Sequence, residues 1–223
     1  MTAPDSARAA ADVAERLAGV RARIADAGGD PARIRVVAVT KGFGAWAIRA
    51  ALDAGLADIG ESYAQELVAK TAELPSDEVA GATTHFIGRL QSNKVRRLAP
   101  LVDVWQSIDR PSIVDEVARR APASTVMLQL RVSDSDTQGG CDPAAAAELL
   151  ARAVDAGLDV VGVMAIGVQG PPETVRAGFD VVRRFADEHA LAQRSIGMSA
   201  DLEQAVAAGA TMVRVGTALF GIR

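Results

Sequence analysis

The sequence predicts a single α/β domain, a (β/α)8 barrel of the TIM type with an extra helix before its first strand. Short apolar runs alternate with longer stretches of helical periodicity along the 223 residues, a pattern typical of parallel strands joined by helices. Hydrophobic residues make up 49% of the chain but aromatic residues only 4%, so small aliphatic side chains must fill the core, as in buried parallel sheets. Barrels of this size commonly form one domain, which we expect to span 1–223.

The hydrophobic pattern of the sequence predicts the position of each helix and strand in turn. An amphipathic helix is expected over about 6–27, where apolar side chains recur at helical spacing. These side chains are Ala9, Val13, Leu17 and Val20. The barrel is expected over about 33–223, with strands at 34–39, 57–60, 85–87, 102–107, 125–132, 160–164, 194–196 and 212–215. Helices are expected between them, at 45–54, 62–74, 91–99, 110–120, 143–156, 172–189 and 200–208. The second and seventh strands are short and weakly marked, so an open parallel sheet is the alternative.

Composition and charge exclude several classes of function. A formal net charge of −4 disfavours a nucleic-acid partner, which calls for a basic face. No stretch approaches the ~20 apolar residues of a membrane helix, and the acidic residues near the N-terminus are untypical of a targeting segment. The lone Cys141 has no partner for an intramolecular disulfide, and Asp142 beside it disfavours a thiolate. We therefore expect a cytoplasmic protein with an incidental thiol.

Lys41, at the end of the first predicted strand, is the first candidate functional residue, because chemistry in such barrels sits on the loops that follow the strands. Side chains alternate along a strand, so Lys41 shares a face with Val37 and Val39. If these valines point into the barrel, the lysine lies at its rim. A lysine desolvated above apolar side chains loses its proton more easily and can form a Schiff base. A solvent-exposed lysine is the alternative.

Arg214, on the last predicted strand, is the second candidate. It alternates with Val213 and Val215, and valines suit the face that packs on helices, so Arg214 is expected to point inward. A guanidinium inside a barrel is costly unless it meets an acceptor. A contact to a ligand is one interpretation, and a structural ion pair with a carboxylate in the lumen is the other.

Two loops suggest a phosphate site, because barrels of this type often bind phosphate after strands seven and eight. Ser199 follows the seventh strand and stands where a helix is expected to begin. Gly216 allows close approach of the backbone, and Thr217 adds a hydroxyl and an amide. A helix N-terminus receives anions, but Ser199 as a simple N-cap of the helix is the alternative.

The two histidines, His85 and His189, lie far apart in the sequence and suggest no metal site. His85 lies on the third predicted strand, where a hydrogen-bonded core histidine is the simpler interpretation and a functional contact the alternative. His189 ends a predicted helix and complements its dipole. No nucleophile elbow, Walker loop or Gly-x-Gly-x-x-Gly motif is found in the sequence.

Six segments together resemble the pyridoxal 5′-phosphate (PLP) homeostasis proteins, which are PLP-binding proteins of the alanine racemase N-terminal-domain type. They are AVTK at 38–41, GESYAQE at 60–66, HFIGRLQSNK at 85–94, VMAI at 163–166, GMSAD at 197–201 and TMVRVGTALFG at 211–221. The segments occur in the family's order and span nearly the whole chain. The third and the last are long and specific.

The resemblance implies a barrel that holds PLP as an aldimine on Lys41. It implies phosphate contacts from Ser199, Gly216 and Thr217, and it places Arg214 near the pyridine nitrogen. The expected cofactor-binding residues also include three others from the matching segments, Ser62, His85 and Met164. Members of the family are cytoplasmic and usually monomeric, and they balance vitamin B6 and amino-acid pools. PLP-dependent apoenzymes are candidate partners.

Two departures from the family pattern affect the site. Ser62 stands where the family usually has Asn, so a contact to the cofactor ring is lost or bridged by water. Gln138, in the loop 136–139, stands where many members have a second lysine. An amide cannot form an aldimine, which puts in doubt a cofactor-transfer role for this position.

We expect a PLP holder rather than an enzyme. Alanine racemase needs a second domain that supplies a tyrosine as the opposite base, whereas this chain ends at Arg223 and has Tyr63 as its only tyrosine. The guanidinium of Arg214 can only donate hydrogen bonds, so the pyridine nitrogen facing it must be an acceptor, which weakens the ring as an electron sink. A PLP enzyme with weak, racemase-like amino-acid chemistry and an aldolase-like Schiff-base barrel without PLP are the alternatives.

Overall fold

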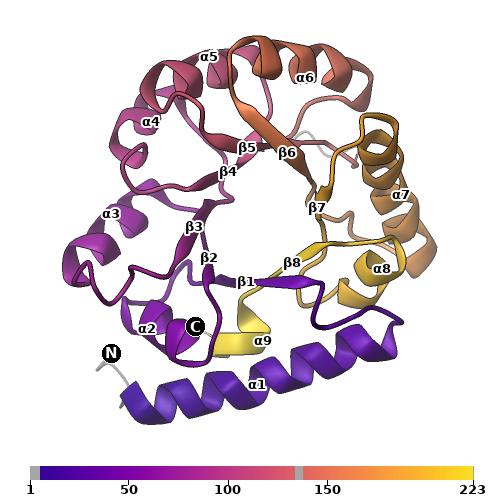
Figure 1. Ribbon diagram of the computed structural model, residues 1–223. Helices are drawn as coiled ribbons and strands as arrows, with labels where there is room; N and C mark the ends of the chain where they lie inside the picture. The colour runs from indigo at the N-terminus through magenta and orange to yellow at the C-terminus, as the bar shows by residue number, and fades with distance from the viewer. Residues whose placement is uncertain (1–5, 134–137, 223) are drawn as a thin grey trace.

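The computed structural model describes residues 6–133 and 138–222, in which eight parallel strands form a closed barrel (Figure 1). The strands are β1 (Arg35–Val39), β2 (Asp58–Glu61), β3 (Thr83–Phe86), β4 (Val104–Ile108), β5 (Thr125–Gln129), β6 (Asp159–Met164), β7 (Gln193–Ser195) and β8 (Met212–Val215). They are neighbours in chain order, and β8 pairs with β1. The predicted (β/α)8 barrel is confirmed, and the open sheet is excluded.

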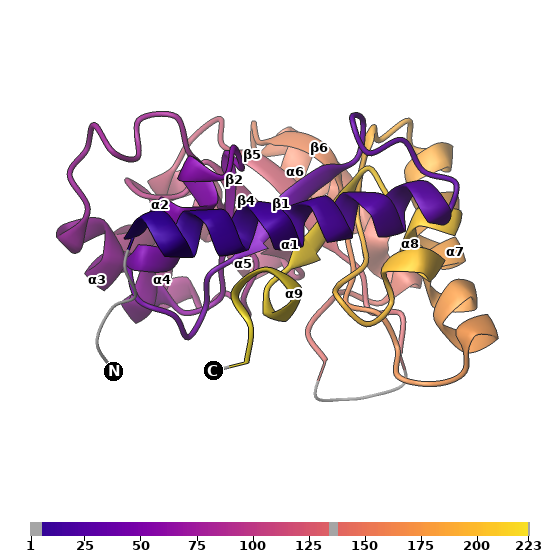
Figure 2. The same ribbon diagram turned by 90° about the horizontal axis from the view of Figure 1, so that it is seen from below.

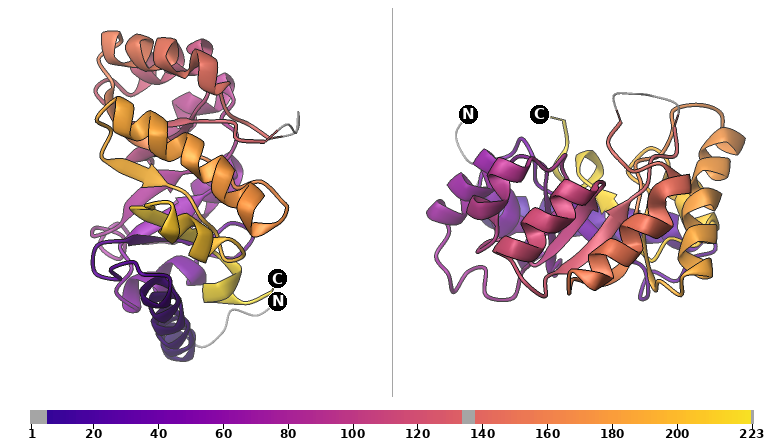
Figure 3. Two further views of the ribbon diagram at one scale, coloured as in Figure 1. Left: turned by 90° about the vertical axis from the view of Figure 1, so that its right-hand side faces the viewer. Right: turned by 90° about the horizontal axis from the view of Figure 1, so that it is seen from above.

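Helices surround the barrel (Figures 1 and 3). They are α1 (Ser6–Asp26), α2 (Trp46–Asp53), α3 (Ala64–Glu73), α4 (Ser92–Leu98), α5 (Pro111–Arg120), the 3-10 turn η1 (Pro143–Ala145), α6 (Ala146–Asp155), α7 (Pro172–Glu188), α8 (Leu202–Ala207) and α9 (Thr217–Phe220). The expected N-terminal helix is confirmed as α1, which crosses the outside of the barrel beside α2, α8 and α9 (Figure 2). Its four expected apolar residues are buried, together with Ile24. None of the described helices combines the length and the apolar character needed to cross a bilayer.

The side chains of β1 point alternately toward the surrounding helices and into the lumen of the barrel. Val36 and Ala38 belong to the hydrophobic cluster packed between strands and helices, whereas Val37 and Val39 are buried outside that cluster. A β carbon added to Gly60 on neighbouring β2 would come within 2.9 Å of Val37 and 3.5 Å of Val39, which places these side chains on the inner face. The two valines therefore point into the barrel, which is the condition under which Lys41 was expected to lie at its rim.

Two boundaries near β7 and β8 differ from the sequence prediction. α8 begins at Leu202 rather than at 200, because the carboxylate of Asp201 accepts the amide N–H of Met198 at 2.5 Å and holds 198–201 in a turn. Residues 217–220, expected as a loop, form the short helix α9, whose Phe220 ring packs 5.3 Å from that of Phe43. Four residues are too few to show helical periodicity in a sequence.

The chain after β5 leaves the barrel before the end of the strand that we predicted. β5 ends at Gln129, and Leu130 forms only an isolated bridge with Cys141. Of the loop 136–139 that differs from the family pattern, 136 and 137 lie outside the described residues.

Candidate functional site

The carboxyl ends of the paired strands β1 and β8 bring two of the expected cofactor-binding residues, Lys41 and Gly216, to one rim of the barrel. Lys41 follows β1 in phase with the inward-pointing Val37 and Val39 and is partly buried. Gly216 follows β8, which pairs with β1. A β carbon at Gly216 would lie 3.1 Å from the carbonyl oxygen of Val39, so glycine permits this loop to pass close beside the segment that carries the lysine.

Arg214 points into the lumen, as predicted, and is only 4% exposed. Its Nη1 donates to the carbonyl oxygen and hydroxyl of Ser195 at 2.5 and 2.8 Å, and its Nη2 donates to the carbonyl of Ala165 at 2.7 Å. Within the described residues these acceptors are carbonyl and hydroxyl oxygens, and none of them is a carboxylate. Burial lowers the pKa of Arg214 to about 10, against the opposing effect of the Asp201 charge. A structural ion pair with a carboxylate in the lumen was the alternative for Arg214. Carbonyl and hydroxyl oxygens hold the guanidinium instead.

A buried ion pair outside the barrel wall fixes the backbone before Lys41. Lys70 of α3 donates to the carbonyl of Thr40 at 2.8 Å and to the carboxylate of Glu61 at 2.5 Å. The hydroxyl of Thr40 donates to the same Glu61 oxygen at 2.6 Å. All three side chains are buried. The side chains of Lys70 and Glu61 thus hold Thr40 at its carbonyl and at its hydroxyl, directly before the candidate lysine.

Glu66 holds the backbone on the other side of the lysine. Its carboxylate accepts the amide N–H of Gly42 at 2.7 Å and lies 3.3 Å from the Nζ of Lys70. We call Thr40, Glu61, Glu66 and Lys70 the lysine clamp. The clamp was not predicted from the sequence, although the i, i+4 spacing of Glu66 and Lys70 on a helix was a usable signal.

Burial makes the ionised form of Glu61 costly. Desolvation raises the pKa of Glu61 above its ordinary value, although the hydrogen bond and charge of Lys70 oppose the shift. Its second carboxylate oxygen, Oε2, is buried without a hydrogen-bond partner among the described residues. The clamp therefore depends on the charge of Lys70.

The two hydroxyls expected at a phosphate site lie on the adjacent loops after β7 and β8. Ser199 lies in the turn before α8, where its carbonyl accepts a hydrogen bond from Arg23 at 2.9 Å. The interpretation of Ser199 as an N-cap is wrong, because α8 starts three residues later with Asp201 at its N-cap position. Thr217 is the first residue of α9 and is exposed. Neither hydroxyl therefore serves as the N-cap of α8 or α9.

Ser62 and Met164 also lie at the carboxyl ends of strands, after β2 and at the end of β6. Ser62 is held by close contact with the loop after β3, since a β carbon at Gly88 would lie 1.9 Å from its carbonyl oxygen. Met164 is fully buried and pairs with Ser195 of β7. With Lys41, Ser199, Arg214, Gly216 and Thr217, the structure brings seven of the eight expected site residues to this end of the barrel.

His85 is the residue that the structure sets apart from the rim. It is fully buried on β3, with Nε2 2.8 Å from a carboxylate oxygen of Asp58 and Nδ1 2.8 Å from the amide nitrogen of Gln106. Both ring nitrogens are therefore engaged by protein groups. His85 is therefore a hydrogen-bonded core histidine, the simpler of the two interpretations that its sequence position allows.

Cys141 and Gln138 contribute no reactive group. Burial, reinforced by the charge of Asp109, raises the pKa of the Cys141 thiol to about 12, so the thiol stays protonated. Gln138 interacts with the hydroxyl of Ser133 and donates to the carbonyl of Gly167 at 3.2 Å.

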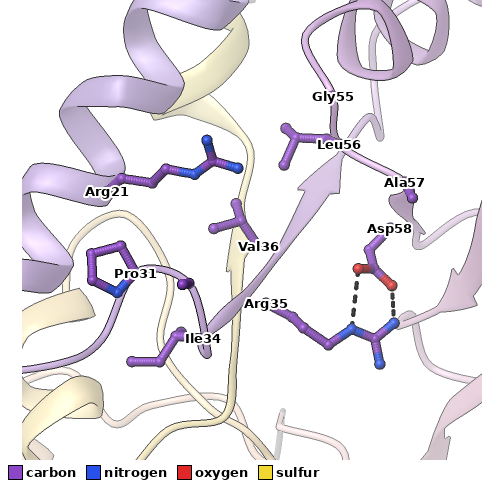
Figure 4. A pocket seen from close by; sticks show the side chains of 10 residues that line it. Arg21, Pro31, Ile34, Arg35, Val36, Gly55, Leu56, Ala57 and Asp58 are labelled. Atoms are coloured by element: carbon purple, nitrogen blue, oxygen red, sulfur yellow. Dashed lines mark hydrogen bonds and ion pairs between the residues drawn. The ribbon is translucent and has the colours of Figure 1, made fainter.

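A pocket of about 580 Å³ lies at the amino-terminal ends of β1 and β2, opposite the rim that carries Lys41 (Figure 4). Arg35 and Asp58 form a two-pronged ion pair at its wall, and Arg21 of α1 extends over it. The ion pair lowers the pKa of Asp58: burial raises it, but the hydrogen bonds from His85 and Arg35 outweigh that effect.

Fold and site together define a barrel protein that presents an amine, a buried guanidinium and two hydroxyls from three adjacent strands. The model of the family described as "Alanine racemase, N-terminal domain" matches residues 12–223. A protein of Escherichia coli K12 named pyridoxal phosphate homeostasis protein is 38% identical over 229 residues, covering 95% of this chain and 97% of that protein. A protein of the same name from Pseudomonas aeruginosa is 40% identical over 227 residues, covering 95% and 96%.

Among solved structures, PipY of Synechococcus elongatus with PLP bound matches with a TM-score of 0.82 and 35% identity, covering 94% of this chain and all of that one (100%). The chain therefore belongs to the alanine racemase N-terminal-domain family, and the resemblance seen in the sequence is confirmed.

Proposed function

We propose that residues 1–223 form one domain that binds PLP and serves intracellular PLP homeostasis. The observation that carries the proposal is the convergence of Lys41, Arg214 and Gly216 on neighbouring strands at one end of the barrel. Relatives named PLP homeostasis proteins, and PipY solved with PLP, support it.

The chemistry of the donor set fits the cofactor. PLP carries an aldehyde that condenses with primary amines, a pyridine nitrogen and a phosphate. Lys41 would supply the amine for a Schiff base, with loss of water. The guanidinium of Arg214, which is buried and can only donate, suits a pyridine nitrogen that accepts. Ser199, Thr217 and the backbone at Gly216 would donate to the phosphate, and Ser62 and Met164 would border the ring.

The role that we propose is not catalytic. Tyr63, the only tyrosine, is 51% exposed and stands at the N-cap position of α3, outside the barrel lumen. A side chain that faces solvent there is poorly placed to act as a second base across the cofactor. We further propose a cytoplasmic monomer that exchanges PLP with PLP-dependent apoenzymes.

The alternative of racemase-like chemistry gives a prediction that an activity assay can check. The PLP-loaded protein should not racemise alanine at an enzyme-like rate, because its only tyrosine, Tyr63, is exposed at the N-cap position of α3. A chiral assay measures the turnover. A rate near the ~10 s⁻¹ that is typical of enzymes would contradict the homeostasis role.

The phosphate assignment predicts a selective loss of affinity. Ser199→Ala should weaken PLP binding about tenfold, since a hydrogen bond to a charged group contributes roughly 1.5–3 kcal/mol. Thr217→Ala should cost a similar amount, or less if its amide is the main donor. Neither change should lower the melting temperature appreciably, because Ser199 caps no helix and Thr217 is exposed.

Pyridoxal, which lacks the phosphate, provides the control. Titration of both ligands into the wild type and the two variants should show weak pyridoxal binding that the substitutions hardly change. If Ser199→Ala weakens pyridoxal as much as PLP, Ser199 shapes the site in general and the phosphate assignment is wrong.

A further inference from the structure

Arg214 is the first member of a chain of polar side chains that crosses the barrel lumen. It donates to the hydroxyl of Ser195, and that hydroxyl lies 2.7 Å from Oε1 of Gln106. The amide nitrogen of Gln106 is 2.8 Å from Nδ1 of His85 and 3.1 Å from the sulfur of Met212. Strands β8, β7, β4 and β3 each contribute one of the linked polar side chains.

The chain continues to the opposite end of the barrel. His85 Nε2 lies 2.8 Å from Asp58, and Asp58 is paired with Arg35 at the pocket shown in Figure 4. Ser195, Gln106 and His85 are fully buried, so water does not compete for these hydrogen bonds. Burying polar groups is unfavourable unless each is satisfied, and here each one is.

The charge of Arg214 sets the direction of every hydrogen bond in the chain. A guanidinium only donates, so the hydroxyl of Ser195 accepts from Arg214 and gives its own proton to Oε1 of Gln106. The Gln106 amide is thereby oriented with its N–H groups toward His85.

The orientation of Gln106 in turn fixes the histidine. Nδ1 of His85 must accept from the amide, which leaves the proton on Nε2, where the carboxylate of Asp58 accepts it. A proton on Nδ1 would turn the amide of Gln106 around, and the hydroxyl of Ser195 would then lose its acceptor.

We propose that Ser195, Gln106 and His85 are positioning residues that fix the guanidinium of Arg214 through a directed hydrogen-bond chain, with His85 held as the neutral Nε2–H tautomer. His85 then influences the ligand site without touching the ligand. The effect on the ligand depends on the proposed PLP function, whereas the tautomer of His85 does not.

Nitrogen NMR of the 223-residue protein tests the directed hydrogen-bond chain without any cofactor. The protein has two histidines, and His189→Gln, a change at the C-cap of α7, assigns the signals of His85. We expect a protonated Nε2 and an unprotonated Nδ1 at neutral pH. A proton on Nδ1, alone or together with one on Nε2, would overturn the proposal.

The matched pair Ser195→Ala and Ser195→Thr tests the effect on Arg214. Alanine removes the hydroxyl that links Arg214 to Gln106, so PLP should bind about tenfold more weakly, with a shifted visible absorption maximum and a changed His85 spectrum. Threonine keeps the hydroxyl and should restore all three measurements toward wild type. If Ser195→Ala leaves the PLP affinity and the absorption maximum unchanged, Ser195 does not position Arg214 and the proposal is wrong.

Failure of this inference and failure of the proposed function give different results. If the wild type binds no PLP, the proposed function fails, but the His85 tautomer still decides the directed chain. If the wild type binds PLP while His85 carries its proton on Nδ1, the function stands and the directed chain is wrong.

Discussion

Lys41→Ala is expected to abolish covalent attachment of PLP while leaving non-covalent binding that is at least about tenfold weaker. The reason is that the amine comes from the end of β1, whereas Ser199, Arg214 and Gly216 come from the ends of β7 and β8 and remain in place. Borohydride reduction followed by mass spectrometry measures the covalent fraction, and titration with PLP measures the remaining affinity.

Lys94→Ala provides the matched control, because Lys94 lies on α4 outside the barrel. This variant should retain the full covalent fraction. If borohydride fixes as much PLP to the Lys41→Ala variant as to the wild type, the assignment of Lys41 is wrong.

Lys70→Met is expected to destabilise the fold by about 3–5 kcal/mol, the range typical of removing one partner from a buried ion pair. The substitution leaves Glu61, which is fully buried, without its cation, and it removes the hydrogen bond to the carbonyl of Thr40. Urea unfolding measures the loss as a change in midpoint at constant slope.

The effect of Lys70→Met should also depend on pH. The pKa of Glu61 is raised in the folded protein, so protonated Glu61 favours folding at low pH and this contribution is lost as pH rises through the raised pKa. The destabilisation should therefore be smaller in acid, where Glu61 is neutral, and larger at neutral pH.

A second substitution separates charge from packing. Adding Glu61→Gln to Lys70→Met removes the unpaired carboxylate, and the double variant should recover part of the lost stability. A double variant that is no more stable than Lys70→Met, together with a loss that is constant with pH, would contradict the charge-based account of the lysine clamp.

The sequence was sufficient to predict the barrel and which residues share a face, because both depend on periodicity. Val37 and Val39 alternate with Val36 and Ala38, and this period of two places Lys41 on the same face as Val37 and Val39. The direction of Arg214 followed from the same rule. The segments that carry the family resemblance supplied the likeness to PLP-binding proteins, which alternation alone does not contain.

The contacts between strands could not be predicted, because they depend on the register of the barrel. Gln106 and Ser195 are 89 residues apart in the chain, and nothing in the local sequence of either suggests that they meet beside Arg214. The start of α8 was missed for a local reason, since the carboxylate of Asp201 turns back to the amide of Met198 and delays the helix. His85 resembles a ligand residue in sequence, but its partners Asp58 and Gln106 become visible only in the closed barrel.

Mapping the lysine that carries PLP tests the central claim most directly. The chain has three lysines, Lys41, Lys70 and Lys94, and the Nζ of Lys70 is buried against two carboxylates. Wild-type protein would be loaded with PLP, reduced with borohydride, digested and sequenced by mass spectrometry. We predict a single modified peptide with the label on Lys41. A label on Lys94 or on the N-terminal amine, with Lys41 unmodified, would contradict the account.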